Sequence, residues 1–144
     1  MTRLINDAGL TLVKEYEGFR AVAYEDTSNI WTLGYGHTSS VREGDTCTQA
    51  EAEVWLEADL GAAEAAVSRL VTVPLTDNQF SALVSFVFNE GQGQFEKSTL
   101  LQKLNAGDYA SVPSELDRWI FDAGKIQQGL ERRRAAEAAL WSRA

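Results

Sequence analysis

Two carboxylic acids near the start of the chain, Glu17 and Asp26, have the residue type and setting of an acid and a base. Leu10, Val13 and Glu17 are spaced along one face of an expected helix, so we expect the Glu17 carboxyl to face the interior or a cleft. Desolvation disfavours the charged form of a carboxyl group, and a general acid near neutral pH must hold its proton. Asp26 lies where an expected strand meets a polar turn, a setting that keeps a carboxylate hydrated and ionised. Carboxyl groups in two such different environments are typical of acid-assisted cleavage of a glycosidic bond.

A threonine six residues after Asp26 adds a hydroxyl group to this pair. In a strand expected over 30–36, side chains alternate between two faces. The apolar face, expected to pack against the protein, consists of Trp31, Leu33 and Tyr35, and the opposite face consists of Thr32, Gly34 and Gly36. Because two of the residues on this second face lack a side chain, we expect room there for a bulky ligand such as a sugar ring.

Each of these residues also has an ordinary structural explanation when it is considered alone. A glutamate at a helix end is usually solvated, an aspartate beside a turn usually serves the turn, and a glycine in a strand often marks a bulge. The catalytic interpretation depends on finding Glu17, Asp26 and Thr32 together within sixteen residues.

The elements that would position these residues are a helix and a hairpin. We expect the first helix to end near Gly18 and two strands, 21–26 and 30–36, to be joined by a turn at 27–29. A capping box formed by Thr48 and Glu51 then begins a helix that we expect to run unbroken to Leu70.

The rest of the chain has the pattern of packed helices. A second capping box begins at Thr76, and an apolar stripe follows it along one helical face: Phe80, Leu83, Val84, Val87 and Phe88. Shorter helices are expected at 98–106, 114–121 and 130–143.

The predicted fold is α+β and mostly helical. A small N-terminal lobe at about 1–47 carries the β-hairpin, a helix at 48–71 connects it, and a helical C-terminal lobe occupies 72–144. A cleft between two lobes would suit a polymeric substrate.

Length and charge restrict the function further. The 144 residues suit a single domain, and one cysteine cannot form an internal disulfide. A formal net charge of −8 argues against nucleic acid and against stable association with anionic membranes. We expect a monomer without a cofactor or metal. The basic cluster Arg132–Arg134 is expected to be a solvated helix face that closes against the acidic body of the protein, with contact to peptidoglycan as the second interpretation.

Several motifs resemble one known family over nearly the whole chain. They are Glu17-Gly18, Ala23 to Asp26, Trp31 to Thr38, Phe88 to Gly91, Phe95, Ser98 to Leu101, Leu104 to Tyr109, Arg118-Trp119, Gly129-Leu130 and Arg132 to Glu137. The sequence is similar to the phage lysozymes of glycoside hydrolase family 24, and to their lambdoid branch in particular. The family commonly has glycine at the position of Asn29. Asparagine tolerates the left-handed backbone conformation, so the turn should survive. The acidic charge is a second departure, because family members are often basic.

The resemblance implies a lysozyme-like fold and hydrolysis of the β-1,4 bond between N-acetylmuramic acid and N-acetylglucosamine in peptidoglycan glycan strands. It implies that Glu17 protonates the leaving oxygen and that Asp26, with Thr32, places or activates the attacking water. The carboxyl separation, about 5 Å for retention and about 6.5–9.5 Å for inversion, is not readable from sequence. The family includes the lysozyme of T-even phages, and resemblance to that member implies inversion.

The resemblance also implies substrate contacts, at Thr38, Phe88, Asn89 and Ser98. Phe88 belongs equally to the apolar stripe and is as much a core candidate. His37, the only histidine, is expected to hold the hairpin in its lobe rather than to transfer protons. Because the first residues are polar and do not resemble a signal peptide, we expect the protein to wait in the host cytoplasm until a separate pore-forming protein delivers it to the cell wall.

Other functions remain to be compared with this one. A zinc amidase usually needs two or more histidines, and the chain has one. A thiol amidase built from Cys47 and His37 would lack an evident third residue to orient the histidine. A module that only binds cell wall would leave the spacing of Glu17, Asp26 and Thr32 unexplained.

Overall fold

The computed structural model describes residues 2–143, which form two compact units. The first unit comprises residues 14–61, and the second comprises residues 2–13 together with 62–143. Helix α1, Asp7–Glu17, begins in the second unit and ends in the first.

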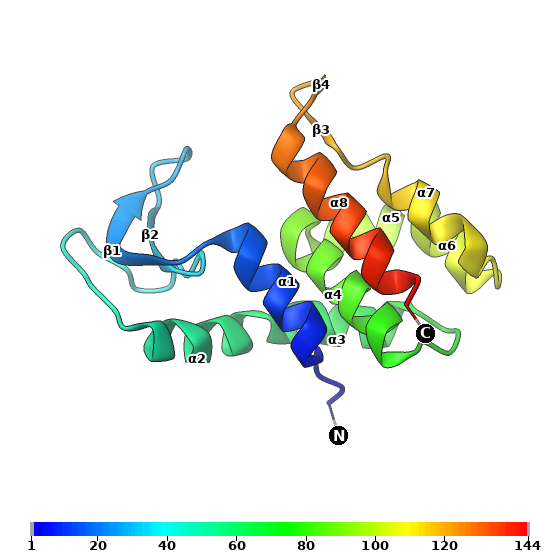
Figure 1. The fold of residues 1–144 in the computed structure, drawn as a ribbon, viewed down its shortest axis with the longest axis horizontal. Helices are drawn as coiled ribbons and strands as arrows, with labels where there is room; N and C mark the ends of the chain where they lie inside the picture. Colours follow the sequence, from blue (N-terminus) through cyan, green and yellow to red (C-terminus); the bar gives the residue numbers. More distant parts are fainter. Residues whose placement is uncertain (1, 144) are drawn as a thin grey trace. The chain divides into compact units, whose positions relative to one another are not determined.

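The first unit is built around a β-hairpin, as the sequence predicted (Figure 1). Strand β1, Arg20–Glu25, pairs antiparallel with β2, Trp31–Gly34, and Tyr24 lies opposite Thr32. Asn29 has a φ of 62°, so this asparagine adopts the left-handed conformation that the turn was expected to require. Helix α2, Gln49–Asp59, follows, and the predicted capping box of Thr48 and Glu51 is present.

The open face expected on the second strand is not open at Gly34. A Cβ atom at Gly34 would lie 2.9 Å from the Cβ of Ala52 on α2, and both residues are buried. Gly34 therefore serves close packing between β2 and α2, and the expectation that it leaves room for a ligand is wrong. The reason is tertiary, because the filling group comes from a helix later in the chain.

The helix expected from Thr48 to Leu70 is interrupted. Helix α2 ends at Asp59 and α3 spans Gly61–Leu70, with Leu60 between them in a turn. Glycine is a poor helix former, and Gly61 stands at the break. The prediction of one unbroken helix is therefore wrong.

The second unit is helical, and its central element is α4, Asp77–Glu90 (Figure 1). All residues from Phe80 to Val87 are buried, so α4 is surrounded on all sides rather than amphipathic. The capping box of Thr76 and Gln79 begins it, as predicted. The other elements are α5 (Gln92–Lys97), α6 (Thr99–Asn105), the 3₁₀ turn η1 (Tyr109–Ser111), α7 (Val112–Leu116), β3 (Phe121–Asp122), β4 (Lys125–Ile126) and α8 (Gln128–Trp141). Helix α8 packs against α4 and α7.

The short elements of this unit depart from the sequence prediction. The helix expected at 114–121 is α7, which ends at Leu116, and a small hairpin follows it. Ala123 and Gly124 form the turn of this hairpin with φ angles of 51° and 81°, a two-residue turn that suits antiparallel strands. Helix α5 was also not expected, since six residues are too few to establish a helical period.

The basic cluster is not a solvated face. Arg133 is 4% exposed and Arg134 is fully buried, and both form ion pairs with the buried Glu137 one turn later on α8. Of the cluster, Arg132 alone is exposed. The surface interpretation of Arg132–Arg134 is thus wrong for two of its three residues.

The close approach at Gly34 predicts a stability defect. Gly34→Ala should lower the free energy of unfolding by about 2–4 kcal/mol, because it adds left-handed strain, with φ at 68°, to a clash with Ala52. Urea unfolding measures the loss.

Gly44→Ala is the matched control. Gly44 has a φ of 88°, and no atom lies within 4 Å of an added Cβ, so only the strain of about 1–2 kcal/mol applies. Equal losses in the two variants would show that the contact with Ala52 is not restrictive.

Candidate active site

Glu17 is the last residue of α1, and its carboxylate lies against the backbone of Gly36. A Cβ atom at Gly36 would lie 3.1 Å from Oε1 of Glu17. The missing side chain of Gly36, whose φ is 80°, thus accommodates the carboxylate. Glu17 is half-buried, in keeping with the helix face on which the sequence placed it.

Asp26 closes the hairpin turn with one carboxylate oxygen. Its Oδ1 accepts hydrogen bonds from the backbone N–H groups of Ser28, at 2.8 Å, and Ile30, at 2.9 Å. The turn chemistry that explains an aspartate at this position is therefore real, and it sets the orientation of the side chain. Within residues 2–143, no hydrogen bond occupies Oδ2.

Thr32 lies on the same face of the hairpin as Asp26. Asp26 pairs with Ile30 through the backbone, and Tyr24 pairs with Thr32 two positions further along the ladder. The hydroxyl of Thr32 donates to the carbonyl of Ile30 at 3.0 Å, which leaves its oxygen able to accept. Thr32 is only 4% exposed, so it can be reached only by a small group such as water.

One stretch of chain thus adjoins all three residues predicted to be catalytic. The segment 30–36 contacts Asp26 at its first residue, carries Thr32, and accommodates Glu17 at its last residue. The three residues that the sequence indicated therefore all adjoin this segment within the first unit.

His37 joins this hairpin to α2. Its Nδ1 lies 2.7 Å from Oδ2 of Asp59, and its ring stacks on Trp55 with ring centroids 4.8 Å apart. Its backbone also pairs with Leu33 in a tight turn. The prediction that His37 holds the hairpin is confirmed.

Cys47 lacks the environment of a nucleophile. Burial, and next the nearby carboxylate of Glu51, raise the pKa of the Cys47 thiol above its ordinary value. An activated cysteine requires the opposite shift. Asp59 engages Nδ1 of His37 and could orient its ring, but the Cys47 thiol donates to the backbone carbonyl of Arg20 rather than to His37.

The predicted substrate contacts have different surroundings. Thr38 is exposed in the first unit. Phe88 and Asn89 lie half-buried in the last turn of α4, where Phe88 is less covered than the core residue Val87. Ser98 is buried, and its hydroxyl caps α6 by accepting from Leu101 N–H at 3.1 Å.

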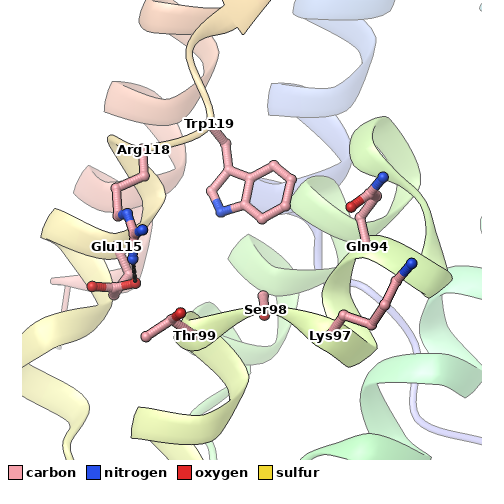
Figure 2. Close-up of a pocket in the computed structure, with 7 residues that line it drawn as sticks. All are labelled: Gln94, Lys97, Ser98, Thr99, Glu115, Arg118 and Trp119. Carbon is pink, nitrogen blue, oxygen red and sulfur yellow. Dashed lines mark hydrogen bonds and ion pairs between the residues drawn. The ribbon is translucent and has the colours of Figure 1, made fainter.

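Ser98 also lies at the base of a pocket that the sequence did not indicate (Figure 2). The pocket has a volume of about 260 Å³ and is lined by Gln94, Lys97, Ser98, Thr99, Glu115, Arg118 and Trp119. Glu115 is held there by Lys103 and Arg118, and the hydrogen bond from Lys103 is the main reason that its pKa is lowered. The spacing of Glu115 and Arg118, one helical turn apart, was the available sequence signal.

Across the described part of the chain, no group of three or more His, Cys, Asp or Glu side chains is arranged to hold a metal ion.

Comparison with known proteins identifies the family. Residues 14–137 match the phage lysozyme family. The endolysin of Acyrthosiphon pisum secondary endosymbiont phage 1 is 43% identical over 97% of this chain and 99% of its own length. The SAR-endolysin of Escherichia phage Mu is 44% identical over 88% of this chain and 74% of its own. Among solved structures, the muramidase domain of SpmX from Asticaccaulis excentricus superimposes with a TM-score of 0.92 at 40% identity, covering 97% of this chain and 98% of that one. The chain therefore belongs to the phage lysozyme family and is a peptidoglycan-hydrolysing glycoside hydrolase.

Proposed function

We propose that this lysozyme cleaves the β-1,4 bond between N-acetylmuramic acid and N-acetylglucosamine, with Glu17 as the general acid and Asp26, assisted by Thr32, placing or activating the attacking water. The observation that carries this assignment is the alignment of the three residues along the segment 30–36. The family and its endolysin and muramidase relatives supply the substrate class.

The setting of Glu17 suits proton donation. Its carboxyl is half-buried at the end of α1 and packs against the backbone of Gly36. A carboxyl group held there keeps a defined direction, and a defined direction is what delivery of a proton to the leaving glycosidic oxygen requires.

The two carboxylate oxygens of Asp26 have different roles in this proposal. Oδ1 is committed to the turn, which fixes the plane of the carboxylate. Oδ2 is then the oxygen that accepts a proton from water. Because the Thr32 hydroxyl hydrogen points to Ile30, its oxygen can accept the other hydrogen of that water. Attack by a water that is activated in this way inverts the anomeric configuration.

Delivery to the cell wall is a separate proposal. No helix within residues 2–143 is long and apolar enough to cross a membrane. We propose that the protein accumulates in the host cytoplasm as a monomer and that a separate pore-forming protein releases it.

Replacing either carboxyl group by an amide should abolish activity in a folded protein. Glu17→Gln removes the transferable proton, and Asp26→Asn removes the base, so each should lose at least about 10²–10⁴-fold in rate. The assay counts new reducing ends released from purified peptidoglycan, which an amidase or a binding module does not make.

Asp26→Glu serves as the graded control, since it keeps the charge with a displaced water site and should retain part of the activity. Urea unfolding of each variant establishes that it is folded. Substantial release of reducing ends by folded Glu17→Gln would assign the acid to another residue.

Cys47 should be dispensable. Because burial keeps the Cys47 thiol protonated, Cys47→Ser should retain near-normal activity, and iodoacetamide should not inhibit the wild-type protein. EDTA should likewise leave digestion of purified peptidoglycan unchanged. A Cys47→Ser protein that is correctly folded but inactive would instead support the hypothesis of a thiol amidase.

Salt should not suppress lysis by this protein. Its net charge is −8, and two of the three clustered arginines are buried. Long-range repulsion from an anionic cell wall should therefore slow the association of the protein with its substrate. Raising ionic strength from 0.01 M to 0.15 M shortens the screening length from ~30 Å to ~8 Å. The initial rate of lysis of permeabilised cells should rise or stay level over that range, and a steep fall would show that a local basic patch steers the substrate.

A further inference from the structure

Arg134 is a fully buried cation at the centre of the second unit. On α8, it forms an ion pair with Glu137, whose Oε1 lies 2.7 Å from its Nε, and its Nη2 donates to Oε2 of Glu137 at 3.1 Å. Its Nη1 donates to Glu90 at 3.1 Å, at the end of α4. The guanidinium also lies over the ring of Phe86, 5.0 Å from its centroid. Arg134 therefore connects the middle of α8 to the C-terminal end of α4.

Arg134 makes one further bond that charge balance does not require. Its Nη2 donates to Oδ1 of Asn89 at 2.7 Å. Arg134 forms ion pairs with two carboxylates, Glu90 and Glu137, so its positive charge is compensated without Asn89. The bond to a neutral side-chain amide therefore needs an explanation other than compensation of charge.

The chemistry of the guanidinium gives that bond a direction. Arginine has only donors, so the atom of Asn89 that faces Arg134 must be the amide oxygen. The NH₂ group of Asn89 must then point away from Arg134. Within the described chain, no hydrogen bond is made by that NH₂ group, and Asn89 is half-buried. The result is a pair of N–H donors held in one orientation and left for another molecule.

The arginine itself has little freedom to move. Glu137 is fixed from a second side by the hydroxyl of Ser85, which donates to its Oε2 at 2.6 Å. Arg133 also bonds to the backbone carbonyl of Ser85, at 3.3 Å. A fully buried guanidinium with carboxylates at both ends of its fork keeps its geometry, and so does the amide bonded to it.

We propose that Arg134 is a positioning residue that locks the Asn89 side chain so that its NH₂ group donates to an acceptor oxygen of the glycan, an N-acetyl carbonyl or a sugar hydroxyl. This inference rests on the proposed function and deepens it, since it specifies how one predicted substrate contact is oriented. The site therefore favours a ligand that presents a hydrogen-bond acceptor to Asn89 and disfavours one that presents a hydrogen-bond donor or a cation there.

Asn89→Asp is the sharpest test. Aspartate has the same shape and bonds to Arg134 at least as well as asparagine, but it has no N–H donor. The variant should unfold in urea no earlier than the wild type and yet show KM for solubilised peptidoglycan strands raised roughly tenfold, with a smaller change in kcat. Unchanged kcat/KM in Asn89→Asp would overturn the proposal.

A second pair of variants tests the role of Arg134. Arg134→Lys keeps the charge but cannot reach Asn89 and both carboxylates at once, so it should raise KM much as Asn89→Ala does. In the double variant, the two losses should not add, because both remove the same oriented donor. Additive losses would show that Arg134 acts independently of Asn89.

Glu90→Gln is the matched control. It disrupts an ion pair of Arg134 without removing the bond to Asn89, so it should lower stability and leave KM near the wild-type value. If KM rises as much in Glu90→Gln as in Arg134→Lys, the increase comes from a general loss of rigidity in the network and not from the bond to Asn89.

A direct readout separates this inference from the proposed function. In the Glu17→Gln protein, titration with peptidoglycan strands should shift the side-chain NH₂ resonances of Asn89, and the Arg134→Lys change should reduce that shift. If wild-type protein releases no reducing ends, the proposed function fails. If it does release them and the Asn89 resonances do not move, this inference alone fails.

Discussion

The positive φ angles of Gly34 and Gly36 are the constraint on which the candidate active site depends. Gly34 lets β2 approach α2 until Ala52 and Trp55 fill the space beside it, and Gly36 leaves the volume that the Glu17 carboxylate occupies. A side chain at Gly34 would push β2 away from α2, and one at Gly36 would displace the Glu17 carboxylate. The backbone of the hairpin therefore shapes the candidate site as much as the side chains of Asp26 and Thr32 do.

The turn at Asp26 uses only one of the two carboxylate oxygens. Its Oδ1 closes the turn by accepting two backbone N–H groups, and the left-handed Asn29 completes that turn. The bonds that explain the aspartate structurally are those that orient its second oxygen. A structural and a catalytic interpretation of the same residue are compatible here, since a carboxylate has two oxygens and the turn uses one.

In the helical unit, polar groups are buried where a simpler core would be apolar. Helix α8 packs on α4 with Arg133, Arg134 and Glu137 among its buried residues. Such a network costs desolvation, which hydrophobic residues of similar volume avoid. The network also orients side chains, because Arg134 bonds to Asn89 as well as to its two carboxylates.

Local chemistry made part of this structure readable from sequence. Both capping boxes, the left-handed Asn29 and the hairpin were predicted correctly because each depends on residues only a few positions apart. The short elements α5, β3 and β4 were not predicted, since two to six residues carry too little periodicity. Arg133 and Arg134 were placed at the surface because a run of charges usually is solvated, and their true partners include Ser85 and Glu90 from a helix more than forty residues away. The sequence by itself determined the family, the chemistry and its three candidate residues. Tertiary structure alone decided that Gly34 faces Ala52 and that the arginines are buried, because burial depends on which distant groups fill the space around a side chain.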